Sequence, residues 1–292
     1  MSRCLVGLCA AALVLSAIAC TPWSKRHTSP LRPAQMSPDS VVLEVFFVRF
    51  PFGDSEANGA LWQEVDEQHF PPVVRRELVR NGFRVGVVGP QPPAPLARLL
   101  ALGDQPPGPL GEETTSGDQL GEEPAVSGWH SQCRAGRRLE IAASKLYPEL
   151  CLLIPDEGGL CGESYRNAQG ILAVTPELER DGRVRLQVVP ELHYGQARQQ
   201  PVPARGGFRL EVRRPRRVFD QLGFAATLTP GQMVLVGCLP NRPGSLGHHF
   251  LTQVRNGQRE QKLLVIRLAQ TQHDDLVVPV QEIPLDDLPA DE

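Results

Sequence analysis

The sequence is poor in aromatic residues and lacks the short motifs that mark the common enzyme classes. Aromatic residues make up 5% of the 292 residues, against 28 prolines and 27 glycines, and this balance indicates many turns and a β-rich architecture. No GxSxG, HExxH or P-loop is present, and no GxGxxG occurs in a strand–helix setting. We therefore expect no catalytic residue, no cofactor and no metal ion, and we predict that the protein is not an enzyme.

A strong charge of either sign is also missing. The formal net charge is −3, which excludes a general affinity for nucleic acid. No two cysteines have the spacing CxxC, and this argues against a zinc or redox site. Hydrophobic residues make up 41% and charged residues 22% of the chain, which is enough for one large or two small globular domains.

The first twenty residues have the pattern of a secretory signal. Arg3 precedes an apolar stretch over residues 4–18, which is shorter than the roughly 20 residues of a membrane-spanning helix. The small residues before Cys20 resemble the lipobox of bacterial lipoproteins, with Ala17 where leucine is usual. The resemblance implies a signal peptide over residues 1–19 and a lipid-anchored envelope protein with a lipidated Cys20. Ordinary secretion is the alternative.

The residues after the lipobox-like segment bear on localisation. Thr21 stands where some lipoproteins carry the aspartate that retains them in the inner membrane. The resemblance therefore favours the outer membrane, on its periplasmic side, with the lipidated N-terminus as the membrane contact. Residues 20–40 are polar and contain prolines, as expected of a lipid anchor and tether.

The cysteines can be sorted by compartment. Cys4 and Cys9 leave with the signal peptide, and Cys20 carries lipid. Four thiols outside the cytoplasm predict two disulfides, although the sequence cannot choose among the three pairings. The candidates are Cys133, Cys151, Cys161 and Cys238.

The rest of the chain divides into segments of different pattern. Residues 41–50 are rich in β-branched and aromatic residues, and helical spacing follows up to Asn81-Gly82. The segments that we predict are a β-α-α-β unit over 41–89, a Pro/Gly/acidic linker over 90–128, a β-domain over 129–278 and an acidic tail over 279–292.

The β-domain shows one strong pairing signal. Asp181-Gly182 lies between residues 170–178 and 183–192, which both read as strands, and Asp-Gly in that position predicts a hairpin. In the second of these strands, Val184, Leu186 and Val188 alternate with polar residues. We therefore expect one buried and one solvent-exposed face.

An ordered set of segments resembles the secretin homology domain of type II and III secretion and type IV pilus outer-membrane channels. The segments are VVLEVFFVRF (41–50), ILAVTPELERDGRVRLQVVPEL (171–192), TPGQMVLVGCLP (229–240), GSLGHHF (244–250) and KLLVIRLAQ (262–270). The likeness lies mainly in residues 139–275 and is close at Gly231, Gln232 and Gly237, with Cys238 where the family has a second glycine. It implies an α+β fold, a mainly antiparallel, secretin-like β-domain with a few helices near the N-terminal side.

The resemblance also implies a function. It points to a structural or assembly role linked to a protein secretion or pilus system, as a homo-oligomer or a secretion-system component. A pilotin-like partner of a channel and an unrelated β-rich lipoprotein are alternatives. The chain departs from the family because it has one small α/β unit at most. It also lacks two adjacent segments with the about 9–11 alternating residues of a membrane-spanning strand, so we do not expect a complete pore.

The glycines around residues 231–239 have physical reasons of their own. Pro230-Gly231 suits a tight turn into a strand, and Gly237 suits a close approach of neighbouring groups. Met233 and Leu235 would then line one face of the strand, with Val234 and Val236 on the other, so we expect burial on both sides.

The strongest local charge is a run of arginines at residues 209–217. Pro215 lies within it and predicts a loop or an edge strand. Such a run could meet anionic lipid headgroups or an acidic partner, or could protect a sheet edge and aid solubility. The candidate interaction residues are Arg209, Arg213, Arg214, Arg216 and Arg217.

Other polar groups fit structural roles better than chemistry. His248-His249 is interpreted as a solvated or capped turn, His273-Asp274-Asp275 as a polar exit to the tail, and the group Glu64, Asp66 and Glu67 as a solvated helix face. The alternative function is an extracytoplasmic hydrolase, which would need distant residues brought together in a pocket. Such a set would be Glu191, His193 and Asp220.

Overall fold

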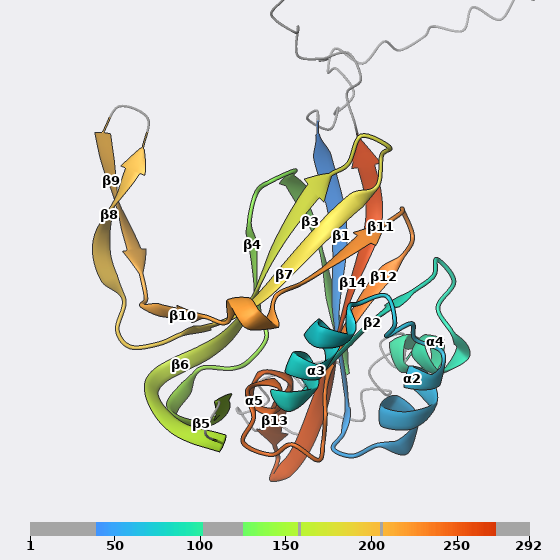
Figure 1. The fold of residues 1–292 in the computed structure, drawn as a ribbon, viewed down its shortest axis with the longest axis horizontal. Coiled ribbons are helices and arrows are strands. Elements are labelled where there is room, and N and C mark those ends of the chain that lie inside the picture. Colours follow the sequence, from blue (N-terminus) through green and yellow to red (C-terminus); the bar gives the residue numbers. More distant parts are fainter. Residues whose placement is uncertain (1–38, 102–124, 157–158, 205–206, 273–292) are drawn as a thin grey trace, which may run out of the picture. The chain divides into compact units, whose positions relative to one another are not determined.

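The structure is a computed structural model that describes residues 39–101, 125–156, 159–204 and 207–272, all within one compact unit, Met36–Glu292 (Figure 1). Every strand pair in it is antiparallel, and a few helices accompany the sheets, as predicted. The predicted signal peptide, Cys20, the acidic tail and His273-Asp274-Asp275 lie outside the described residues.

The first sheet is built from both ends of the described chain. Its strand order is β2-β12-β14-β1-β3, and β13 also pairs with β14. The strands are β1 (Ser40–Pro51), β2 (Phe83–Val88), β3 (Val126–Arg134), β12 (Met233–Cys238), β13 (Thr252–Arg255) and β14 (Gln258–Gln272). All six residues of β12 are buried, which confirms the expected burial on both of its faces.

This sheet changes the predicted division of the chain. The elements expected over 41–89 are present in order: β1, the short helices η2 (Glu56–Ala60) and α2 (Leu61–Gln63), α3 (Pro72–Arg80) and β2. However, β1 and β2 are not neighbours, because β1 pairs with β14 and β3 while β2 pairs with β12. Two strands alone cannot bury their apolar faces, so this segment joins the C-terminal strands in one sheet. The predicted linker contains the helix α4 (Ala94–Ala101) and the start of β3.

The second sheet contains the predicted hairpin. Leu178 lies opposite Val184, and Gly182 in the turn has φ +80, a left-handed conformation that glycine adopts without strain. Val184, Leu186 and Val188 are buried while the residues between them are exposed, as expected. The strands of this sheet are β4 (Leu139–Ala142), β5 (Tyr147–Asp156), β6 (Gly159–Leu178), β7 (Val184–His193), β10 (Arg216–Val218) and β11 (Phe224–Leu228).

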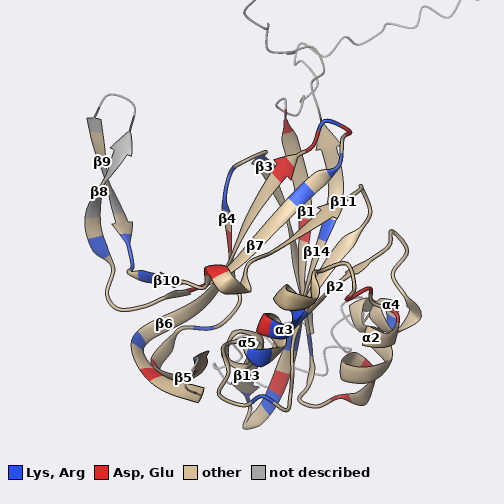
Figure 2. Ribbon diagram, in the orientation of Figure 1, with Lys and Arg blue, Asp and Glu red and all other residues tan. Residues whose placement is uncertain are grey.

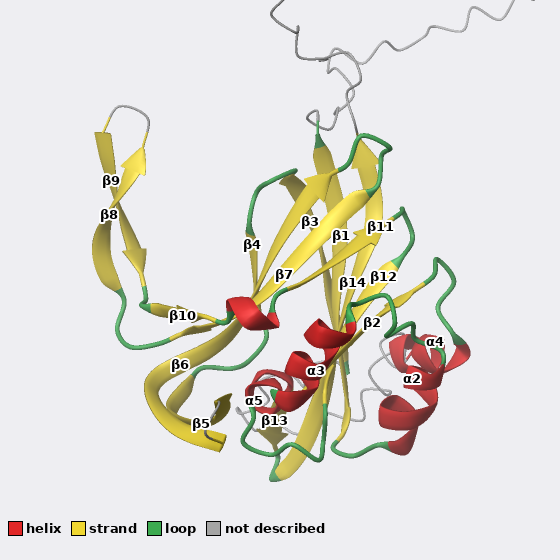
Figure 3. Cartoon of the chain, viewed as in Figure 1, coloured by secondary structure: helices red, strands yellow, loops and turns green. Residues whose placement is uncertain are grey.

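Two hydrophobic cores lie on opposite faces of the first sheet. The larger core joins the two sheets through residues such as Val234, Ile266 and Leu186, and it also takes Leu78 of α3. The smaller core packs Trp62 and other side chains of η2, α2 and α4 against the outer face of the first sheet. Figure 3 shows these helices gathered on one side of the strands.

Several elements were not predicted. The helices include α5 (Leu246–Leu251) and the 3-10 turn η3 (Asp220–Leu222) in the C-terminal part, not only on the N-terminal side. The strand β8 (Arg198–Ala204) was also not predicted. It pairs with β9 (Gly207–Arg213), a segment whose sequence does predict a strand, in a separate two-stranded sheet that we name the arm. Figure 1 shows the arm standing away from the two larger sheets.

Candidate interaction surface

The arginine run occupies the end of the arm and the strand that follows it. Arg209 and Arg213 lie in β9, Arg214 and Pro215 connect the strands, and Arg216 and Arg217 begin β10. β10 is an edge strand that pairs with the end of β7, as the proline predicted. Figure 2 marks in blue the arginine-bearing parts at the base of the arm and in β10.

Arg217 is tied to the second sheet. Its Nη1 donates to the Tyr165 hydroxyl at 2.6 Å and forms an ion pair with Glu163, and its Cζ lies 5.2 Å from the centre of the Phe219 ring. Burial, together with the hydrogen bond to the Glu163 carboxylate, raises the pKa of Tyr165. These contacts join β10 to β6, so Arg217 has a structural role.

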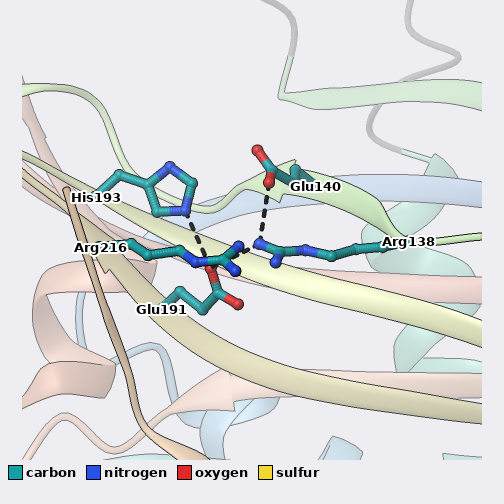
Figure 4. A network of polar contacts seen from close by, with 5 residues as sticks. All are labelled: Arg138, Glu140, Glu191, His193 and Arg216. Carbon is teal, nitrogen blue, oxygen red and sulfur yellow. Dashed lines mark hydrogen bonds and ion pairs between the residues drawn. The ribbon is translucent and has the colours of Figure 1, made fainter. Parts of the chain in front are cut away.

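A buried carboxylate organises the neighbouring network (Figure 4). Glu191, at the end of β7, is 3% exposed, and its Oε2 lies 2.6 Å from Arg138 Nη2 and 3.1 Å from His193 Nε2. Arg216 Nη1 is more distant, at 3.7 Å, and Arg138 also contacts Glu140 Oε1 at 3.0 Å. A buried carboxylate is costly unless it is paired, so these cations hold Glu191 in place.

An open groove of about 890 Å³ adjoins this network at the base of the arm. Arg214 lines it, half-buried, and within the described ranges its guanidinium has no hydrogen bond or ion pair. Three arginines and one glutamate line the groove, which makes it electropositive. Its lining residues are Glu140, His193, Ala197, Val212, Arg213, Arg214, Pro215 and Arg216.

The structure brings together part of the set considered for catalysis. Glu191 and His193 meet, because residues i and i+2 of a strand point to the same face. Asp220 is exposed at the first residue of η3 and is not part of the network in Figure 4. Sequence reasoning missed Arg138, which reaches Glu191 from outside β7 and carries no signal of its own.

The residues that carry the secretin resemblance have structural roles in the first sheet. Gly231 has φ +93 in the turn before β12, and the Gln232 side chain accepts a hydrogen bond from the Thr229 amide at 2.8 Å. A Cβ on Gly237 would come within 2.8 Å of the Trp62 ring. Gly237 therefore permits the smaller core to pack directly against β12.

The four candidate disulfide cysteines are free thiols in the structure. Cys151 lies opposite Ser164 and Cys161 opposite Ile154 on the paired strands β5 and β6. This offset of three residues puts their side chains on opposite faces. Cys133 lies in β3, and burial raises the pKa of the Cys238 thiol to about 11. The two predicted disulfides are thus not formed in this arrangement.

The prediction of a turn at His248-His249 is wrong, because these residues lie in the helix α5. Ser245 caps this helix by accepting a hydrogen bond from the His248 amide, and Phe250 anchors it in the larger core. His248 is only 6% exposed, and burial, with the neighbouring His249 and Arg259, lowers its pKa to about 4.

The remaining acidic group also has local partners. Asp66 accepts a hydrogen bond from the Gln68 amide at 2.9 Å, and Glu67 pairs with Arg84, while Glu64 is exposed. Over the described ranges no three His, Cys, Asp or Glu side chains gather as metal ligands. Among the helices of these same ranges, none has the length and apolar character needed to span a bilayer.

Comparisons with known proteins add no relative. No protein-family model, no curated protein and no solved structure matches the chain.

Proposed function

We propose that this protein is a lipid-anchored envelope protein in which a secretin-like β-domain has a structural or assembly role rather than an enzymatic one. In this proposal Cys20 carries the lipid, and the chain lies on the periplasmic side of the outer membrane. It assembles there with copies of itself or with a component of a protein secretion or pilus system.

The observation that carries this proposal is the open edge of the first sheet. β3 is the last strand in the sheet order, and among the described residues it pairs only with β1. In an edge strand, every second residue points its unpaired N–H and C=O groups outward, where a further strand can bind them, and natural proteins usually blunt such edges. In β3 most residues are exposed, and neither proline nor lysine interrupts it.

Apolar surface accompanies this edge. Trp129 in β3 is 40% exposed and lies over Phe47, with 6.0 Å between the ring centres. An open groove of about 550 Å³ beside the strand is lined by apolar side chains, among them Phe46, Leu100 and Val126. In strand addition, backbone hydrogen bonds supply affinity and neighbouring apolar pockets supply specificity. The edge and groove together therefore suit a strand of another chain.

The test is the mass of the complex extracted from native membranes in mild detergent. Wild-type protein should migrate as an assembly, and Cys20→Ala should release the chain from the membrane. Gln132→Lys adds a charge to the β3 edge and should dissociate the assembly. Its matched control is Gln187→Lys, an exposed position on β7, which is paired on both sides, and it should leave the mass unchanged. A monomer in the wild type would overturn the proposal.

One observation favours a second function, an extracytoplasmic hydrolase. The hydrogen bond between Glu191 and His193 orients an imidazole beside the electropositive groove, and an oriented imidazole is the usual general base. Among the described residues that line the groove, none is a serine, threonine or cysteine, so the nucleophile would be water. Ester hydrolysis that is lost in His193→Gln, at an unchanged melting temperature, would establish this function.

A further inference from the structure

The arm carries an apolar stripe on a sheet that no other described element covers. Phe208 is 79% exposed, and Leu210 and Val212 are each 67% exposed. Because alternate residues of a strand share a face, these three side chains form a continuous stripe about 14 Å long. An isolated two-stranded sheet is only marginally stable in water, and large exposed apolar side chains in a row mark a contact surface.

The outer edge of the arm is poorly suited to a protein strand. Pro201 and Pro203 lie in β8 opposite Leu210 and Phe208. Proline is tolerated in a paired strand where its missing amide hydrogen faces away from the partner. The outward edge of β8 therefore lacks two donors that another strand would need. The two prolines therefore disfavour the addition of a further strand at the β8 edge.

Positive charge is concentrated where the arm joins the body. Arg198 lies directly opposite Arg213 at the open end of the hairpin, and both are exposed. Like charges in directly opposed positions destabilise a strand pair. Arg214 follows at once, half-buried in the electropositive groove. The base of the arm is therefore locally basic, although the whole chain has a net charge of −3.

We propose that the arm is a second membrane contact, in which Phe208, Leu210 and Val212 enter the interface of a bilayer that contains anionic phospholipid. Arg198 and Arg214 then bind its phosphate groups. A stripe of apolar side chains with arginines on the polar side is the composition of interfacial membrane elements, and long arginine side chains reach headgroups from beside the apolar surface.

The proposed lipid anchor also favours a bilayer as the surface that the arm contacts. Residues 21–40 span at most about 70 Å when extended. A lipidated Cys20 would therefore keep the arm within reach of one membrane, where even a weak contact is strengthened by the high effective concentration. This inference rests on the proposed lipid anchor, but it needs no assembly.

The test measures membrane binding by the arm in a chain that lacks the proposed lipid anchor. The chain from Thr21 onward contains all described elements but lacks the signal and the lipidated cysteine. Its binding to phosphatidylcholine vesicles and to vesicles with one-third phosphatidylglycerol is measured by sedimentation at 0.1 M and 0.5 M salt. We expect binding to the anionic vesicles only, weakened by high salt, because the screening length is about 10 Å at 0.1 M and shorter above it.

Two pairs of variants divide the two contributions. Phe208→Ser/Leu210→Ser and Arg198→Gln/Arg214→Gln should each weaken binding by about tenfold or more. The matched controls are Val73→Ser/Val254→Ser, at two valines that are 62% and 64% exposed, and Arg180→Gln/Arg185→Gln, at two exposed arginines of the β6–β7 hairpin. Both controls should bind as the unsubstituted chain does.

Three outcomes would overturn the inference: no binding to anionic vesicles, equal binding by the arm variants, or equal weakening in the controls. A change in the mass of the extracted complex caused by Phe208→Ser/Leu210→Ser, without vesicle binding, would assign the arm to a protein partner instead. The proposed function fails separately, because it requires an assembly that depends on β3 and Cys20.

Discussion

The strand β12 and the arm strand β9 are both rich in apolar residues, but one is buried in the protein and the other is exposed. Every residue of β12 is buried between two cores, whereas Phe208, Leu210 and Val212 of β9 are largely exposed. Local sequence accounts for the strand in both cases. What differs is the partner: β12 has strands on both sides and side chains on both faces, whereas β9 pairs, among the described strands, only with β8. The apolar content of a strand therefore indicates that a surface will be covered, but not what will cover it.

The largest expected difference between the body and the arm is the effect of the same truncation on stability. Leu186→Ala removes a side chain that is 0% exposed, and core Leu→Ala changes lower the free energy of unfolding by about 2–5 kcal/mol. Leu210→Ala should change it by less than about 0.5 kcal/mol, because the leucine is 67% exposed. Urea unfolding measures both. Equal losses would mean that the arm is packed against the body.

The next effect concerns the glycine that separates β12 from the smaller core. Gly237→Val would push a side chain into Trp62, and overpacking of this kind costs about 1–3 kcal/mol. Combining it with Trp62→Leu should restore part of the loss, since the two sites share one space. Urea unfolding of the wild type, the two single variants and the double variant gives the coupling energy between the two sites. Strict additivity would contradict direct contact.

A smaller effect depends on pH. The pKa of His248 in the folded protein is about 4, below the ordinary histidine value of 6.5, so the unfolded chain takes up the proton first. The free energy of unfolding should therefore fall as the pH drops from about 6.5 to about 4, by at most about 1.4 kcal/mol per pH unit. Above pH 6.5 the histidine should have no effect. His248→Leu should show a shallower loss over this window, and an identical slope would place the acid sensitivity elsewhere.

The smallest perturbation is chemical labelling, which changes no side chain before the measurement. Cys151 and Cys161 are exposed and should react with a maleimide in the native protein, whereas Cys238 should react only after unfolding. Mass spectrometry of labelled peptides identifies each site. A disulfide between Cys151 and Cys161 in protein from the periplasm would show that β5 and β6 pair in a register other than the one described here.

Prediction from sequence succeeded where the signal was local. Asp181-Gly182 between alternating strands is sufficient to identify the β6–β7 hairpin, and the four apolar residues after Gly231-Gln232 identify a strand buried on both sides. It failed for β8, because the prolines that blunt the arm also hide its strand character. Prediction also failed for α5, because its six residues include a glycine and two histidines and show no helical periodicity of apolar residues.

The site was predicted less completely than the fold. The arginine run and the edge strand after Pro215 were visible, and the spacing of Glu191 and His193 was sufficient to place both on one face of β7. Arg138 could not be assigned to Glu191, since a contact across 53 residues leaves no mark in either segment. The apolar stripe was likewise missed, because exposure depends on which neighbours are lacking.

The pairing of β1 with β14 has a consequence for how the chain folds. Ser40 lies opposite Gln272, so the middle of the first sheet joins the earliest and the latest described strands. Contacts between residues far apart in the sequence make folding slow, because the intervening chain must be ordered first. During folding, the N-terminal strand has to wait for the C-terminal one. A chain that is cut before β14 would therefore lose the centre of its first sheet.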